Sequence, residues 1–215
     1  MRWAVVWQSL DYLLEGALWT LVIAVGVLAI GTALGLVFGL LRLVKTPLVA
    51  APVRAYVEVA RGTPLIMQMF FIYYGLPPAL GVEIPPYVAV VLAMTVFASG
   101  NSAEIVRGAI ESLPAGQFEA ARSGGLGYLQ TMRYVILPQA LRRMLPPQMG
   151  LFTTLIKDTS LAAILGVFEL TTAAQRTIER TLASFELYLF AAAVYFVICY
   201  PLSVYTRGVE RRQVV

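Results

Sequence analysis

Long apolar stretches separated by short polar segments dominate the chain. Crossing the hydrocarbon core of a bilayer takes about 20 apolar residues of α-helix. Five stretches reach that length, and they are roughly Ala17–Leu41, Tyr56–Leu76, Tyr87–Ile110, Gln148–Leu170 and Leu187–Thr206. Open sheet edges are not tolerated in lipid, so each stretch is expected to be a helix. The pattern predicts an all-α integral membrane protein with five transmembrane helices. It forms a single domain over residues 1–215, with its core at about 12–206.

Composition agrees with a membrane protein and excludes several kinds of chemistry. Hydrophobic residues make up 59% of the chain and charged residues 13%, whereas soluble domains carry about 25% charged residues. The chain has no histidine, so no Ser-His-Asp set or HExxH motif is possible, and no GxxxxGK[ST] phosphate loop occurs. The lone Cys199 cannot form an intrachain disulfide. We therefore expect no catalytic residues, no metal and no cofactor on this chain.

The basic residues predict how the chain is oriented. Short cytoplasmic loops of membrane proteins are rich in Lys and Arg. Three segments carry most of these residues: Arg42, Lys45 and Arg54; Arg107, Arg122, Arg133, Arg142 and Arg143; and Arg207, Arg211 and Arg212. The N-terminus is therefore predicted outside and the C-terminus in the cytoplasm. The proline-rich segment Pro77–Pro86 has no basic residue and is predicted to be a stiff external turn without helix.

The segment 111–147 is too polar to span a membrane and too long for a simple turn. Good helix formers at Gln117–Ser123 are followed by Gly124-Gly125, which predicts a short helix with a glycine end. A second helical piece is predicted at Tyr128–Val135. Small Ala120 and Ala121 allow a partner surface to approach closely, and Gly125 allows a sharp bend. This cytoplasmic loop is interpreted as a docking element. The alternative is a pair of interfacial helices with no partner.

Charged side chains at membrane depth are costly, and they usually face a bundle interior or a wet cavity. Glu104 and Asp158 are predicted to lie at similar depth on neighbouring spans, with Asn101 and Thr154 on the same faces. They predict a small polar pocket on a substrate path. The alternative for Glu104 is an ion pair with Arg107 at i,i+3.

Two further features belong to the predicted spans. Lys157 is expected to form a structural ion pair with a carboxylate of another helix, and Gln68 is a candidate residue of the path. Gly31, Gly35 and Gly39 repeat every four residues in the first span. A line of small residues lets a second helix approach closely, so it predicts packing within the subunit.

Several segments together resemble the membrane subunits of ABC importers of the polar amino-acid branch, the histidine/glutamine permease type. The coupling pattern of that family matches Glu119, Ala120, Ala121, Gly125, Leu137 and Pro138, with Val135 where Ile is usual. The other matching segments are Gly16-Ala17-Leu18-Trp19-Thr20, Arg61-Gly62-Thr63-Pro64, Ala103-Glu104-Ile105-Val106-Arg107-Gly108, Leu137-Pro138-Gln139-Ala140 and Lys157-Asp158-Thr159-Ser160-Leu161. The family often has an aromatic residue where this chain has Asn101, a departure that bears on substrate identity.

The resemblance implies a bacterial inner-membrane permease that works as a dimer with a second copy or a similar chain. It also implies a separate ATPase subunit that holds ATP-Mg and docks on the coupling loop, and an extracytoplasmic amino-acid-binding protein. Two acids in the path favour a polar or cationic amino acid. The first rival is an ion- or proton-coupled carrier that uses Glu104 and Asp158, but such carriers usually show paired repeats and none is evident. The second rival is a membrane scaffold without transport.

Overall fold

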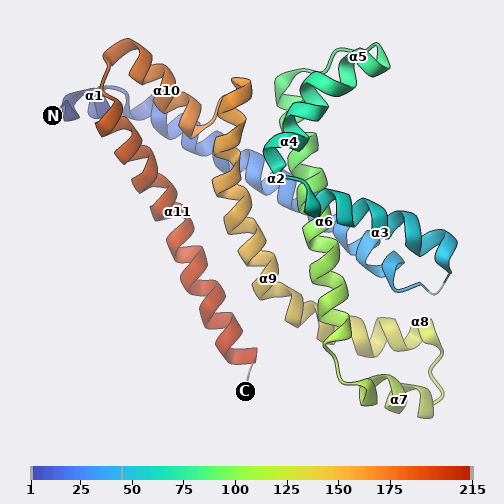
Figure 1. The fold of residues 1–215 in the computed structure, drawn as a ribbon. Coiled ribbons are helices and arrows are strands. Elements are labelled where there is room, and N and C mark those ends of the chain that lie inside the picture. The colour runs from blue at the N-terminus through green and yellow to red at the C-terminus, as the bar shows by residue number, and fades with distance from the viewer. Residues whose placement is uncertain (1, 45, 214–215) are drawn as a thin grey trace.

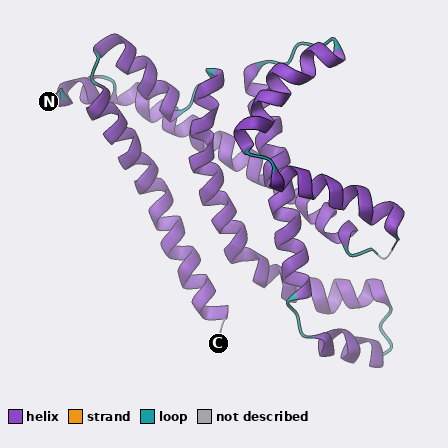
Figure 2. Cartoon of the chain, viewed as in Figure 1, coloured by secondary structure: helices purple, strands orange, loops and turns teal. Residues whose placement is uncertain are grey.

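The structure is a computed structural model that describes residues 2–44 and 46–213, so Lys45 lies outside the described residues. The described residues form helices joined by loops and turns, with no strand among them (Figure 2). In chain order, with π- and 3₁₀-helical segments marked η, the elements are α1 (Trp3–Gln8), α2 (Leu10–Arg42), α3 (Pro47–Gly62), α4 (Leu65–Phe70), η1 (Phe71–Gly75), α5 (Leu76–Leu80), α6 (Pro86–Glu111), α7 (Ala115–Ser123), α8 (Tyr128–Thr131), η2 (Met132–Ile136), α9 (Leu137–Asp158), η3 (Thr159–Leu165), α10 (Leu170–Thr181) and α11 (Ser184–Gln213).

Three described helices are long and apolar enough to cross a membrane: Leu10–Arg42, Pro86–Glu111 and Ser184–Arg211. They contain the first, third and fifth predicted stretches. A fourth span is possible if Tyr128–Leu165 and Leu170–Thr181, which are bent by 44° relative to each other, count as one. The all-helical membrane class is therefore confirmed, whereas the count of five spans stays a prediction.

The predicted second span, Tyr56–Leu76, is wrong as a continuous helix. Its first part belongs to α3, which ends at Gly62, and the apolar helix Leu65–Leu80 starts afresh. Thr63 between them is extended, with φ −107° and ψ 138°. A residue before proline is disfavoured in the helical region, so Pro64 explains the break. The proline-rich turn is also partly helical, because Leu76–Leu80 forms α5 before Gly81 takes φ +67°.

The predicted fourth span, Gln148–Leu170, has different limits. α9 begins at Leu137, inside the segment assigned to the polar loop, and Pro146 and Pro147 lie within it. The π-helical η2 ends at Ile136, two residues before Pro138, and a proline removes a backbone donor and crowds the preceding turn. At its other end the span is interrupted, since Gly166 takes φ +72° and Leu170 starts α10.

The three glycines predicted to pack against another helix do so on α6. A Cβ atom built on Gly31 would lie 2.5 Å from the Ala98 Cβ, and one on Gly35 would lie 2.4 Å from the Ser102 Cβ. Gly39 meets Val106 at 2.6 Å in the same way. The prediction of close packing within the subunit is confirmed, and α2 and α6 cross near the centre of the molecule (Figure 1).

The two termini lie toward opposite ends of the molecule (Figure 1). Figure 1 shows the C-terminal end of α11 and the helix α7 toward one end, and the N-terminus and α10 toward the other. The N-terminal segment is tied down there, because the Arg2 backbone N–H donates to the Glu186 carboxylate at 2.6 Å and its guanidinium donates to the Thr181 carbonyl. Which end faces the cytoplasm stays a prediction.

Candidate functional site

The predicted docking helix is present as α7 and projects from the bundle together with α8 (Figure 1). Ala121 is buried, while Glu119 and Ala120 on the same helix are exposed. Phe118 packs against an apolar cluster that includes Ile110, Leu113, Met132 and Ile136. One side of α7 therefore rests on the end of α6 and on η2. The other side offers a small residue and a carboxylate to solvent.

Glycine ends α7 as predicted. The Gly124 N–H donates to the Ala120 carbonyl at 3.0 Å, and the Leu126 N–H donates to the Ala121 carbonyl at 3.1 Å. Gly125 adopts φ +82°, a left-handed conformation that costs an L-residue roughly 1–2 kcal/mol. A Cβ there would meet nothing within 4 Å. The need for glycine at this position therefore comes from the backbone conformation and not from lack of space.

Side-chain hydrogen bonds hold α7 and the end of α6 against α9. The Gln139 side chain donates to the Gln117 side chain at 3.1 Å. The Arg143 guanidinium donates to the Ser112 carbonyl at 2.6 Å. Leu137 and Pro138 begin α9. These hydrogen bonds connect α7 and the end of α6 to the helix that forms the candidate fourth span.

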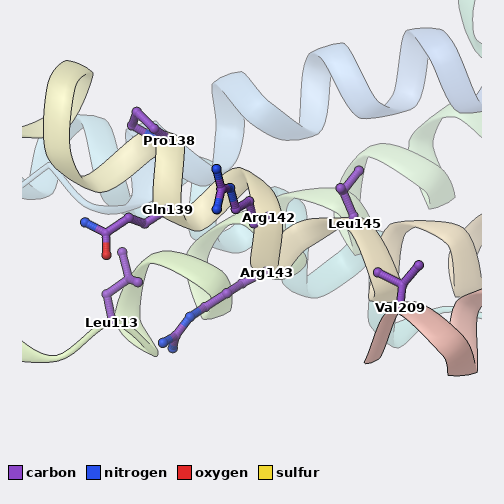
Figure 3. Close-up of a pocket in the computed structure, with 7 residues that line it drawn as sticks. All are labelled: Leu113, Pro138, Gln139, Arg142, Arg143, Leu145 and Val209. Carbon is purple, nitrogen blue, oxygen red and sulfur yellow. The ribbon is translucent and has the colours of Figure 1, made fainter. Parts of the chain in front are cut away.

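Beside these contacts lies an open groove of about 630 Å³. Figure 3 shows its lining: Pro138, Gln139, Arg142, Arg143 and Leu145 come from α9, Leu113 follows α6, and Val209 comes from α11. Two arginines make this surface basic.

Glu104 lies in a cluster of arginines that the sequence only partly indicated. Arg107 contacts it at i,i+3 and also contacts Glu111, so the alternative of an ion pair within α6 is confirmed. The Arg42 guanidinium on α2 donates to Glu104 at 2.6 Å, and that of Arg61 on α3 lies 3.4 Å away. Both carboxylate oxygens of Glu104 face guanidinium groups.

A band of polar contacts lies close to this cluster. The Tyr56 and Ser99 hydroxyls are 2.7 Å apart, which links α3 to α6. The Ser102 hydroxyl donates to the Gln148 side chain at 3.2 Å, and the Gln148 amide donates to Thr32. Helices α2, α3, α6 and α9 are thus joined by hydrogen bonds at one level.

The structure does not place Asp158 at the depth of Glu104. Gln148 lies beside Ser102, and α9 carries Asp158 ten residues farther on, which is about 15 Å along the axis at 1.5 Å per residue. The sequence reasoning went wrong because it took Gln148 as the start of the span. Thr154 lies between them and donates to the Gly150 carbonyl at 3.1 Å. Within the described part of the chain, Lys157 forms no ion pair, so its predicted pairing is absent there.

The two remaining candidates of the path lie near the break in the second span. The Asn101 side chain donates to the Phe97 carbonyl at 2.8 Å. The Gln68 amide donates to the Ala60 carbonyl at 2.8 Å and to the Thr63 hydroxyl at 2.9 Å. These hydrogen bonds connect α4 to the end of α3 across the break. Its Oε1 is buried and has no hydrogen-bond partner among the described residues. A contact of these residues with substrate stays a prediction.

Sequence reasoning missed one buried carboxylate. Glu169 is fully buried and caps α10, where it accepts from the Thr172 N–H at 2.7 Å. It also accepts from the Tyr195 hydroxyl at 2.8 Å and the Thr20 hydroxyl at 3.4 Å. The donors come from three helices, and no sequence signal pointed to this site because Gln148–Leu170 was predicted as one continuous span. These contacts join α2, α10 and α11.

Comparison with known proteins identifies the family. Residues 31–215 match the family described as "Binding-protein-dependent transport system inner membrane component". The glutamine transport system permease protein GlnP of Escherichia coli (strain K12) is 40% identical over 211 residues, which covers 98% of this chain and 96% of that protein. The probable glutamine ABC transporter permease protein GlnP of Bacillus subtilis (strain 168) is 38% identical over 209 residues, with 96% and 95% covered.

A solved structure agrees with these relatives. The crystal structure of an amino acid ABC transporter with histidines has a chain that is 32% identical and superposes with a TM-score of 0.92, covering 99% of both chains. The inward-facing methionine transporter MetNI, at 22% identity and a TM-score of 0.72, shares the fold. The chain belongs to the family of binding-protein-dependent transport system inner membrane components, and it is a permease subunit of the ABC transporter type.

Proposed function

We propose that this chain forms the membrane path of an ATP-driven importer for a polar amino acid in the bacterial cytoplasmic membrane. The single observation that carries the proposal is the geometry of α7. It is a short helix outside the bundle, with Glu119 and Ala120 exposed, and it ends at a glycine with φ +82°. Such an element suits a separate ATPase that pushes on the membrane helices.

The contacts around α7 transmit its movement to the membrane helices. The exposed side of α7, which carries Glu119 and Ala120, meets the ATPase, and Gly125 sets the angle of the helix. The movement passes through the Gln117–Gln139 hydrogen bond to the start of α9 at Leu137 and Pro138. ATP and Mg²⁺ are held by the ATPase, and this chain supplies no residue to the hydrolysis.

The names of relatives favour glutamine or a similar polar amino acid as the substrate. An extracytoplasmic binding protein delivers it, and a second copy or a similar chain completes the path. Asn101, Thr154, Asp158 and Gln68 line the path. Glu104 stands at its edge as the counter-ion of the arginines.

Site-specific photo-crosslinking tests the docking proposal. A p-benzoylphenylalanine replaces Glu119 on α7, and in a matched control it replaces Glu83, which is exposed and lies in the segment predicted outside. The chain is co-expressed with its ABC ATPase, and crosslinked products are identified by mass. We expect the ATPase to be trapped from position 119 and not from position 83. Trapping from position 83 alone, or from neither position in an assembled complex, would refute docking at α7.

A further inference from the structure

The cluster around Glu104 carries more positive than negative charge. Glu104 contacts three guanidinium groups, those of Arg42, Arg61 and Arg107. Arg107 also forms an ion pair with Glu111. Three cations against two carboxylates leave one positive charge in excess. Arg42 also has a buried Nε without a hydrogen-bond partner in the described structure. The cluster is therefore incompletely neutralised, although its side chains are partly withdrawn from water.

Arg61 is the member of the cluster with capacity for another partner. Its side chain is 43% exposed, against 11% for Arg42 and 30% for Arg107, and its ion-pair distance to Glu104 of 3.4 Å is the longest of the three. Arg42 and Arg107 both donate hydrogen bonds to Glu104. The excess charge is thus most accessible at the Arg61 guanidinium.

Arg61 also lies at the polar face of α6. It occupies the last turn of α3, directly before the break at Thr63 and Pro64. A Cβ atom on Gly100 would lie 3.4 Å from the Arg61 Cγ, so the Arg61 stem runs over α6 at Gly100, and its head reaches Glu104 one turn farther on. Interrupted helices inside membrane domains are frequent sites of substrate contact in transporters.

We propose that Arg61 binds the carboxylate of the transported amino acid as it passes the level of Glu104. This inference rests on the proposed function and names a contact within it. A further cation at Glu104 would be repelled by three arginines and would find both carboxylate oxygens already occupied. A carboxylate at Arg61 instead meets the excess positive charge, and the planar guanidinium matches its two oxygens. The sequence had suggested the opposite polarity, with Glu104 binding an ammonium group.

The test compares an amino acid with the same molecule lacking the negative charge. L-glutamine and L-glutaminamide, whose carboxylate is replaced by an amide, are titrated into the purified complex of permease and ATPase without binding protein. Wild type is compared with Arg61→Gln, with Arg61→Lys and with Arg54→Gln. Arg54 is an exposed arginine seven residues earlier on the same face of α3, so it controls for a general loss of charge.

A charge-assisted hydrogen bond changes affinity by roughly 10-fold or more. We expect wild type and Arg54→Gln to bind glutamine about 10-fold more tightly than glutaminamide. Arg61→Gln should lose most of this preference and Arg61→Lys should keep part of it. An unchanged preference in Arg61→Gln overturns the proposal. If Arg61→Gln fails to assemble, the test rests on wild type and Arg61→Lys. The proposal is overturned if each of these two proteins binds glutamine and glutaminamide equally well.

The proposed function is tested separately in the same preparation. ATP-driven uptake of glutamine by wild type, with binding protein added, supports the function whatever Arg61 does. Uptake with an unchanged ligand preference in Arg61→Gln overturns only the carboxylate contact. Absence of uptake for glutamine overturns the importer proposal and, with it, the contact that rests on it.

Discussion

Replacing Gly35 by alanine tests the close contact between α2 and α6. The added Cβ would lie 2.4 Å from the Ser102 Cβ and 2.9 Å from the Ala103 backbone nitrogen. Carbon atoms prefer separations of about 3.5–4.0 Å, so the two helices must move apart by about 1 Å or the contact must distort. Such overpacking costs about 1–3 kcal/mol.

Gly26 on the same helix provides the matched control, since a Cβ there meets nothing within 4 Å. Alanine is favoured over glycine in a helix by about 1 kcal/mol, and this gain is common to both variants. The difference between Gly35→Ala and Gly26→Ala therefore isolates the packing cost. Gly35→Ala is expected to be about 1–3 kcal/mol less stable than Gly26→Ala.

The assay is reversible unfolding of the purified protein in mixed micelles by increasing SDS, followed by the fluorescence of its tryptophans. The midpoint of Gly35→Ala should fall below that of Gly26→Ala. The reasoning is refuted if the two alanine variants have equal free energies of unfolding, because the helices would then have room that the structure denies them.

The remaining predictions concern the ion cluster, the bend after α7 and the topology. Glu104→Gln removes the shared counter-ion of three arginines. It should lower the free energy of unfolding of the complex by about 1–3 kcal/mol, a value reduced because the cluster is partly exposed. A melting curve like that of wild type, with only uptake lost, would contradict this. Gly125→Val should reduce ATPase coupling more than Gly125→Asn, since φ +82° suits asparagine better; equal coupled ATPase rates would remove the conformational argument. Cysteines at Gln117 and Glu83 in a Cys199→Ala background should be labelled from outside intact cells only at Glu83; labelling at Gln117 alone would reverse the topology.

Features set by local sequence were predictable. The four-residue spacing of Gly31, Gly35 and Gly39 identified the face of α2 that meets another helix. The end of α7 followed from Gly124-Gly125, since a left-handed residue after a helix favours glycine. The i,i+3 pair of Glu104 and Arg107 was also readable from helical spacing.

Features that depend on long-range pairing or on competing signals could not be predicted from the sequence. Arg42 and Arg61 reach Glu104 from two other helices, and no spacing rule connects them. The Tyr56–Leu76 span was misjudged because its apolar length outweighed the breaking signal of Thr63-Pro64. The start of α9 was placed too late, because the polar composition of the segment 111–147 indicated a loop, whereas α9 already begins at Leu137.

The central claim is that this chain carries an amino acid across the membrane at the expense of ATP on a partner subunit. Its most direct test is uptake of labelled L-glutamine into proteoliposomes that contain the permease, its ATPase and the binding protein, with ATP or a non-hydrolysable analogue on the ATPase side. A protonophore is added in a parallel sample to test the rival carrier. We predict uptake that requires hydrolysable ATP and is unaffected by the protonophore. Uptake without ATP that the protonophore abolishes would contradict the account and favour an ion-coupled carrier.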